Sequence, residues 1–200
     1  MSVRQSLLAI LAQGPCYGYQ LRHEFARRTG AVWPLNVGQI YNTLERLERD
    51  GLVSRDDADA QGHVYWEITP AGAAEVALWL SGPAERPLAP RDELAIKVAL
   101  TATLPGADAS SVIDAERAAV ESRLSELRLL RSSREDGGPE DLAHSLVLDS
   151  MIFAAEAESR WLEHAGARLA EHPQHSLSLA LDVDRPKRGR PVRVERDALV

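Results

Sequence analysis

Amide and guanidinium side chains recur at helical spacing in the run GQIYNTLERLERD, which covers residues 38–50. At 100° per residue, a helix would place Gln39, Asn42, Arg46 and Arg49 on one face, beside Gly38. Amides can pair bidentately with adenine, and guanidinium groups can bind guanine or phosphate. This face therefore carries groups that could read base-pair edges in a DNA major groove.

Apolar residues occupy the opposite face of the same helix. They are Val37, Ile40, Leu44 and Leu47, which fall within about 80° of one another. Glu45, Glu48 and Tyr41 lie on one flank. Polar residues opposite an apolar stripe are also common on helices that are only solvated. The helix alone leaves both readings open.

The elements around this helix predict its position. Asn36 is a good N-terminal cap and Gly51 a good C-terminal stop, while Thr69-Pro70 begins a further helix. Helices are expected over residues 2–13, 18–28, 37–50 and 70–80, and strands over residues 52–55 and 63–69. Three helices followed by a two-stranded hairpin are typical of a winged helix-turn-helix, whose third helix enters the major groove.

The second half is expected to be helical throughout, so the fold class is mainly α. A proline-rich linker (82–90) precedes helices over residues 91–103, 108–134 and 139–171, with a bend at Gly137-Gly138. Three helices bury their apolar stripes poorly alone, so we expect a homodimer. We predict a winged-helix DNA-binding domain (1–81), a helical dimerisation and candidate effector domain (91–172), and a basic, disordered tail (173–200).

Charge is distributed unevenly along the chain. The net charge is −7 overall, with −2 in residues 1–80, −7 in 81–181 and +2 in 182–200. The single cysteine, Cys16, excludes an internal disulfide. No long apolar run indicates a signal peptide or membrane span, so we expect a soluble cytoplasmic protein.

Three separated blocks resemble the PadR family of transcriptional regulators. The blocks are PCYGYQL (15–21), VGQIYNTLERLERDGLV (37–53) and GHVYWEITPAG (62–72), and RDELAIKVAL (91–100) resembles the start of that family's C-terminal domain. The resemblance implies a homodimeric repressor that binds a palindromic operator in double-stranded DNA. It also implies release from DNA by a small-molecule effector bound near the dimer interface.

The resemblance assigns roles to particular residues. Base reading falls to Gln39, Asn42 and Arg46, and phosphate contacts to Tyr19 and Tyr41. The full expected DNA-binding set is Tyr19, Gly38, Gln39, Tyr41, Asn42, Arg46, Gln61, Gly62 and His63. The wing departs from the family's basic tip: it carries acids at positions 56, 57 and 59, which repel phosphates.

Two further features have a functional and a plain interpretation. PKRGRP (186–191) resembles an AT-hook, so Arg188, Gly189 and Arg190 could form an accessory arm in the minor groove; the alternative is a solubilising tail. An aromatic effector could stack on Trp161 near Phe153 and Met151, although packing in a core or interface is the commoner use of such residues.

The sequence leaves two other function classes open. A winged helix used only for protein contacts would suit the acidic surface. An enzyme is disfavoured: His172 and His175 have metal-ligand spacing but no convincing third ligand, and phosphate loops and nucleophile elbows are missing. We therefore expect no catalysis, cofactor or metal.

Overall fold

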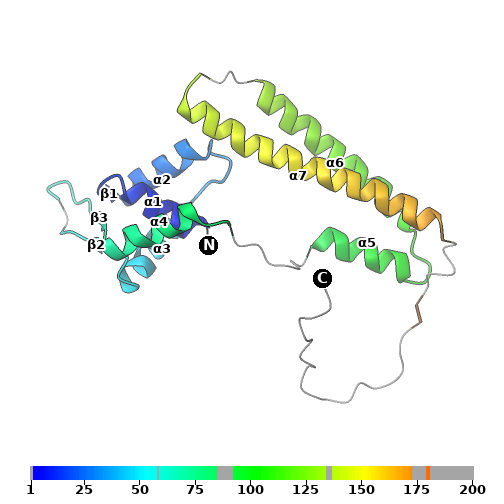
Figure 1. The fold of residues 1–200 in the computed structure, drawn as a ribbon, viewed down its shortest axis with the longest axis horizontal. Coiled ribbons are helices and arrows are strands. Elements are labelled where there is room, and N and C mark those ends of the chain that lie inside the picture. The colour runs from blue at the N-terminus through cyan, green and yellow to red at the C-terminus, as the bar shows by residue number, and fades with distance from the viewer. Residues whose placement is uncertain (1, 58, 85–91, 134–136, 173–178, 181–200) are drawn as a thin grey trace, which may run out of the picture.

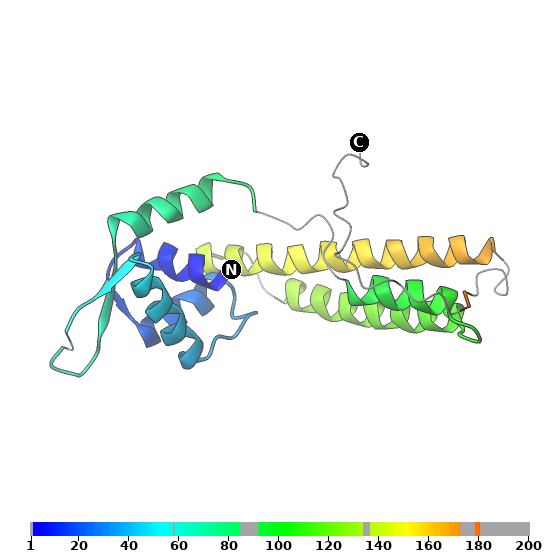
Figure 2. The ribbon, with the colours of Figure 1, turned by 90° about the horizontal axis from the view of Figure 1, so that it is seen from below.

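The chain, in a computed structural model, forms a winged-helix half and a helical half (Figures 1 and 2). The structure describes residues 2–57, 59–84, 92–133, 137–172 and 179–180. The elements are α1 (Ser2–Leu11), β1 (Cys16–Tyr17), α2 (Gly18–Arg28), α3 (Val37–Arg49), β2 (Val53–Arg55), β3 (Tyr65–Ile68), α4 (Pro70–Ser81), α5 (Glu93–Thr103), α6 (Ala109–Ser132) and α7 (Pro139–Ala170). The predicted tail arm at residues 188–190 lies outside the described residues.

Side chains fix both ends of α3. Asn36 Oδ1 accepts from the Gln39 backbone N–H at 2.8 Å, and Gln39 Oε1 accepts from the Asn36 backbone N–H at 3.0 Å. This reciprocal pair is a capping box, which satisfies two N–H groups at the start of the helix. Gly51 follows the helix with φ +75°, a left-handed conformation that suits glycine.

The sheet has three strands in the order β1-β3-β2, all antiparallel. The expectation of a two-stranded hairpin was incomplete, because Cys16 pairs with Trp66 and Tyr17 with Tyr65. A two-residue strand has no alternation for a sequence pattern to reveal. Because β1 pairs with β3 and leads directly into α2, it fixes the start of α2 against the base of the wing.

The winged-helix half is built around one apolar core. Leucines of α1, α2 and α3 meet Trp66 of β3 and Val76 of α4 in its interior. The fully buried side chains of this core are Leu7, Leu8, Leu11, Leu21, Ile40, Leu44 and Leu47. All three helices therefore bury an apolar stripe in this core. For α3, the buried face is the one predicted from its sequence periodicity.

The helical half has a separate core between α6 and α7, with α5 beside them. Ile113, Val120 and Leu124 of α6 face Ala155 and Leu162 of α7, and Val98 of α5 joins them. Ion pairs between α6 and α7 include Arg123–Glu158 (2.7 Å), Arg128–Glu156 (2.7 Å) and Arg131–Asp149 (3.1 Å). Polar pairs therefore flank an apolar seam in this antiparallel helix pair.

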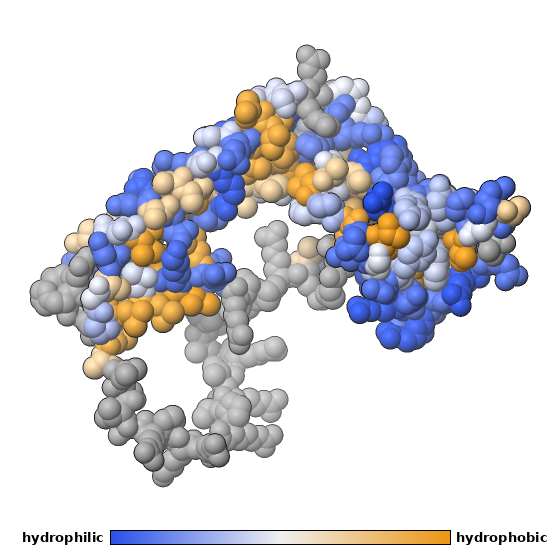
Figure 3. Space-filling model, turned by 180° about the vertical axis from the view of Figure 1, so that it is seen from behind, coloured by the Kyte–Doolittle hydropathy of each residue, from blue (hydrophilic) through white to orange (hydrophobic). Residues whose placement is uncertain are grey.

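Several large apolar side chains of the helical half face outward. Exposed positions include Ile96 and Leu100 on α5, Leu129 and Leu130 on α6, and Leu142, Leu146 and Phe153 on α7. Figure 3 shows apolar areas over this half, at the left of that view. The apolar positions of α7 thus divide between the seam with α6 and an uncovered face.

The two halves touch where α2 meets the start of α7. Arg27 Nη1 lies 2.8 Å from Glu140 Oε1. Gly30, with φ +65°, packs against the ring of His144, and a Cβ there would lie 2.0 Å from His144 Nδ1. In the described part of the chain, no helix combines the length and apolar character that crossing a membrane requires.

Candidate nucleic-acid interface

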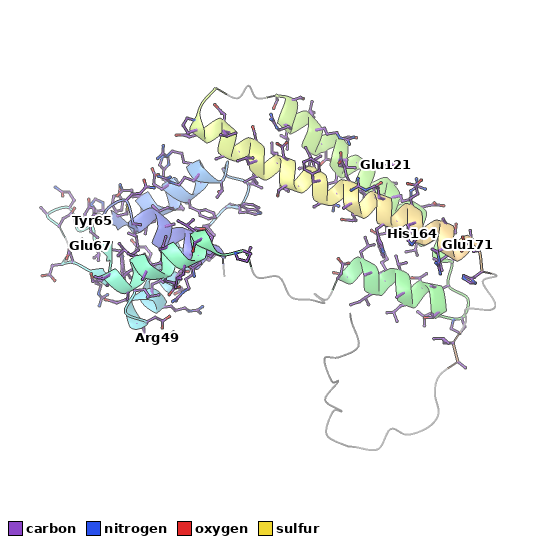
Figure 4. All side chains as sticks on the ribbon, viewed as in Figure 1. Arg49, Tyr65, Glu67, Glu121, His164 and Glu171 are labelled. Atoms are coloured by element: carbon purple, nitrogen blue, oxygen red, sulfur yellow. The ribbon has the colours of Figure 1, made fainter. Side chains whose placement is uncertain are left out.

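The outward face of α3 is exposed along its length. Gly38, Gln39, Asn42, Glu45, Arg46 and Arg49 are exposed on this helix. Figure 4 shows Arg49 at the outer margin of the winged-helix half, away from α6 and α7. The expected polar face is thus present, with Glu45 exposed at its edge.

The candidate base-reading side chains differ in whether they already have a hydrogen-bond or ion-pair partner within the chain. Gln39 Oε1 is engaged by the Asn36 backbone, so only its Nε2 amino group remains for a ligand. Arg49 interacts with its neighbour Asp50 at 3.4 Å. Within the described residues, the side chains of Asn42 and Arg46 have no hydrogen-bond or ion-pair partner. Asn42 and Arg46 are therefore the side chains of this face that are best placed to bind a ligand.

Tyr41 and Tyr19 both lie at the start of α2. The half-buried Tyr41 ring packs so closely on Gly18 that an added Cβ would lie 2.7 Å from Tyr41 Cζ. Tyr19 is exposed, and the guanidinium of Arg22 lies 5.9 Å from the centre of its ring. The sequence reasoning missed Arg22, although its spacing of three residues from Tyr19 on a helix was available as a signal.

The turn of the wing is organised by Asp59. Its Oδ1 accepts from the backbone N–H groups of Gln61 (2.9 Å) and His63 (2.8 Å). Gly62 has φ +80°, and the His63 ring stacks on Tyr17 with centroids 4.6 Å apart. Asp59 therefore shapes the wing, whereas Asp56 and Asp57 are the exposed acids at its tip.

The wing turn is expected to loosen in acid. The hydrogen bond from the His63 backbone holds the pKa of Asp59 below its ordinary value. Because the folded pKa is lowered, the stabilisation is complete above the unfolded value of about 3.9 and is lost as pH falls through the folded pKa. NMR titration should show the Gln61 amide signal moving only below the ordinary aspartate range. Asp59→Asn should abolish this movement and Asp57→Asn should keep it; movement that survives Asp59→Asn would contradict the assignment.

The three candidate effector residues do not come together. Met151 is partly buried, whereas Phe153 and Trp161 are exposed, and about 160° around α7 separates Met151 from Phe153. The large cavity of the helical half, about 1200 Å³, lies at the end of α7, and none of these three residues lines it. A binding site that includes all three residues would therefore require a surface contributed by a partner subunit.

In the described ranges, no group of three or more histidine, cysteine or acidic side chains is arranged to hold a metal ion. His172 lies at the cavity, and His175 is outside the described residues.

Comparison with known proteins shows which regulators this chain resembles. Residues 7–78 match the transcriptional regulator PadR-like family, and residues 90–170 match the family described as virulence activator alpha C-term. The negative transcriptional regulator PadR of Bacillus subtilis (strain 168) is 24% identical over 171 residues, which are 80% of this chain and 93% of that protein. Residues 7–78 thus form a domain of the PadR-like family of transcriptional regulators.

Solved structures of PadR-like regulators share the fold over both halves. Bacillus subtilis PadR in complex with p-coumaric acid has a TM-score of 0.62 at 23% identity, covering 85% of this chain and 99% of that chain. The same protein in complex with operator DNA has a TM-score of 0.58 at 23% identity, covering 84% and 99%. The Vibrio cholerae virulence activator AphA has a TM-score of 0.57 at 18% identity, covering 84% and 98%. The likeness thus extends over both the winged-helix half and the helical half of the chain.

Proposed function

We propose that this PadR-like chain is a homodimeric repressor that binds a palindromic operator by inserting α3 of each copy into the major groove. The observation that carries the proposal is the outward face of α3, where Asn42 and Arg46 are exposed and unpaired within the described residues. The opposite face of this helix is anchored by three fully buried residues, Ile40, Leu44 and Leu47. Bacillus subtilis PadR, which has the same fold, is known in complex with operator DNA.

Contacts outside the groove complete the proposed interface. Tyr19, Tyr41 and Arg22 contribute hydroxyl and guanidinium groups for phosphates, which position a protein on DNA without reading sequence. On the wing, Gln61, Gly62 and His63 are the contact candidates. The exposed acids at positions 56 and 57 weaken phosphate binding there, so α3 and α2 supply most of the affinity.

Dimerisation is proposed through the uncovered apolar face of the helical half. Leu142, Leu146 and Phe153 on α7 are 53%, 61% and 68% exposed, next to the exposed leucines of α6. Burying such surface against a second copy is favourable by about 25 cal/mol per Å². A closed dimer also presents two copies of α3, as an inverted-repeat operator requires.

Leu146→Glu is expected to weaken the dimer by at least about tenfold, because a buried carboxylate without a partner is costly. Sedimentation equilibrium of the variant should show monomer at concentrations where the wild type is dimeric. Ala74→Glu, which adds the same charge at an exposed position of α4 in the winged-helix half, is the control and should leave association unchanged. A Leu146→Glu variant that dimerises like the wild type would remove this face from the interface.

A small aromatic effector is part of the same proposal. Bacillus subtilis PadR is known in complex with p-coumaric acid. Stacking of an effector on Trp161 stays a prediction. Because Trp161, Phe153 and Met151 do not come together on α7, such a site requires a surface contributed by the partner. Regulation by binding needs no catalysis, metal or cofactor, and a cytoplasmic location goes with a target in genomic DNA.

A gel-shift titration tests the proposed function. The full-length protein is titrated against the DNA upstream of its own gene at several salt concentrations. One dimer should bind each operator, excess unrelated DNA should not displace it, and affinity should fall steeply with salt. Equal affinity for unrelated DNA, or no binding, would favour the second candidate, a winged helix that contacts only proteins, which the acidic net charge of −7 suits.

A further inference from the structure

A large cavity occupies the end of the helical half that lies away from the winged helix. It has a volume of about 1200 Å³ and is bounded by the end of α5, the turn at Gly106, the start of α6 and the last turns of α7. In Figure 4, the labelled His164 and Glu171 mark this end of α7. The cavity is therefore separate from the proposed DNA-binding face.

Small residues of α7 line this cavity, namely Gly166, Ala167 and Ala170. Gly166 faces Ile113 of α6, where an added Cβ would make an ordinary van der Waals contact with Ile113 Cγ2 at 3.6 Å. Ile113 and Leu162 are both buried and provide an apolar wall. The cavity could hold an apolar body of the size of a small organic molecule.

Arg117 supplies an unpaired charge at this cavity. Its Nε is buried without a hydrogen-bond partner, and no ion pair to Arg117 is found within the described residues. The other arginines of α6, at positions 123, 128 and 131, each pair with a carboxylate of α7. A partly buried guanidinium without a partner is costly, and carboxylate is the group that its geometry fits best.

The rim restricts the charge of a ligand. Asp114 and Glu163 line the cavity and are exposed to solvent, so their carboxylates repel a ligand with several negative charges. Asp108 also lines it, but its carboxylate accepts from the Ser111 backbone N–H at 3.1 Å as the cap of α6. A nucleotide or a polyphosphate is therefore disfavoured, and a single carboxylate directed at Arg117 is favoured.

We propose that this cavity binds a small monocarboxylic acid with an apolar body, whose carboxylate pairs with the guanidinium of Arg117. The proposal deepens the proposed function, because it places an effector in the dimerisation half of the regulator. It differs from the sequence prediction, since Trp161, Phe153 and Met151 do not line this cavity. Binding itself requires only the fold, not DNA.

Calorimetric titration of the full-length protein tests the site. The probes are benzoate, phenylacetate, cinnamate and octanoate, each compared with its uncharged methyl ester. At least one acid should bind, and its ester should bind at least about tenfold more weakly, because a charge-assisted hydrogen bond is lost. Arg117→Gln should weaken the acid by a similar factor, Arg117→Lys should retain part of the affinity, and Arg128→Gln, on the same helix but outside the cavity, should change nothing.

A second variant tests the cavity independently of charge. Gly166→Leu fills the space beside Ile113 and should abolish binding, while circular dichroism verifies that the variant remains folded. No binding of any acid to the wild type, equal binding of acid and ester, or full binding to Arg117→Gln would overturn the proposal. Gel shifts on the same samples separate the two claims: a protein that binds its operator but no acid keeps the proposed function and loses this site.

Discussion

Replacing Arg46 by alanine lowers affinity for the operator by about tenfold to hundredfold and reduces discrimination at one base pair in each half-site. A bidentate arginine–guanine contact provides about 1–3 kcal/mol of discrimination against the wrong base. Arg46 is exposed, and within the described residues nothing competes for its guanidinium. Fluorescence anisotropy with the operator and its single-base variants measures both effects.

Matched variants separate base reading from a general loss of charge. Arg128→Ala on α6 removes the same charge far from α3 and should leave DNA binding unchanged. Tyr41→Phe removes a proposed phosphate contact and should weaken all DNA sequences alike. If Arg46→Ala also weakened every sequence by the same factor, Arg46 would be a phosphate contact and not a reader of bases.

Gly72→Ala is expected to destabilise the winged-helix half by about 3 kcal/mol, the upper part of the usual range for overpacking. An added Cβ would lie 2.2 Å from the backbone oxygen of Leu52 and 2.8 Å from Ile68 Cγ1. The Leu52 oxygen cannot move aside easily, because it accepts from the Thr69 backbone N–H at 3.0 Å. Urea unfolding followed by circular dichroism measures the change.

Gly166→Ala is the control for the same chemical change. The new methyl group meets Ile113 Cγ2 at 3.6 Å, an ordinary contact, and alanine favours a helix over glycine by up to about 1 kcal/mol. This variant should be slightly stabilised. A Gly72→Ala variant as stable as the wild type would show that the junction of β2 and α4 is looser than described.

Helix ends and the faces of α3 were predictable because single residues determine them. The caps Asn36 and Thr69 both accept the expected backbone N–H groups, and Gly51 adopts the expected left-handed conformation. The helical periodicity of α3 correctly separated its buried residues from the exposed Asn42 and Arg46. These features depend on local geometry, which sequence spacing records directly.

Features that depend on packing between distant segments were not predictable. The cavity beside Arg117 needs three helices to meet, and β1 needs a partner about fifty residues away. A glutamine at position 39 is compatible with both helix capping and base reading, and in the structure its Oε1 atom caps the helix. Its residue type alone did not distinguish between these two roles. Met151 and Phe153 could have been separated by a helical projection, since a spacing of two residues places them on different faces.

Protection of guanine N7 from dimethyl sulfate shows whether α3 enters the major groove, because N7 lies in that groove. With the operator bound, we expect protected guanines in two symmetric half-sites, and Arg46→Ala should restore their reactivity while the complex is held at saturation. Bound DNA with unprotected N7 atoms, or with protection in one half-site only, would contradict insertion of two α3 helices into the major groove.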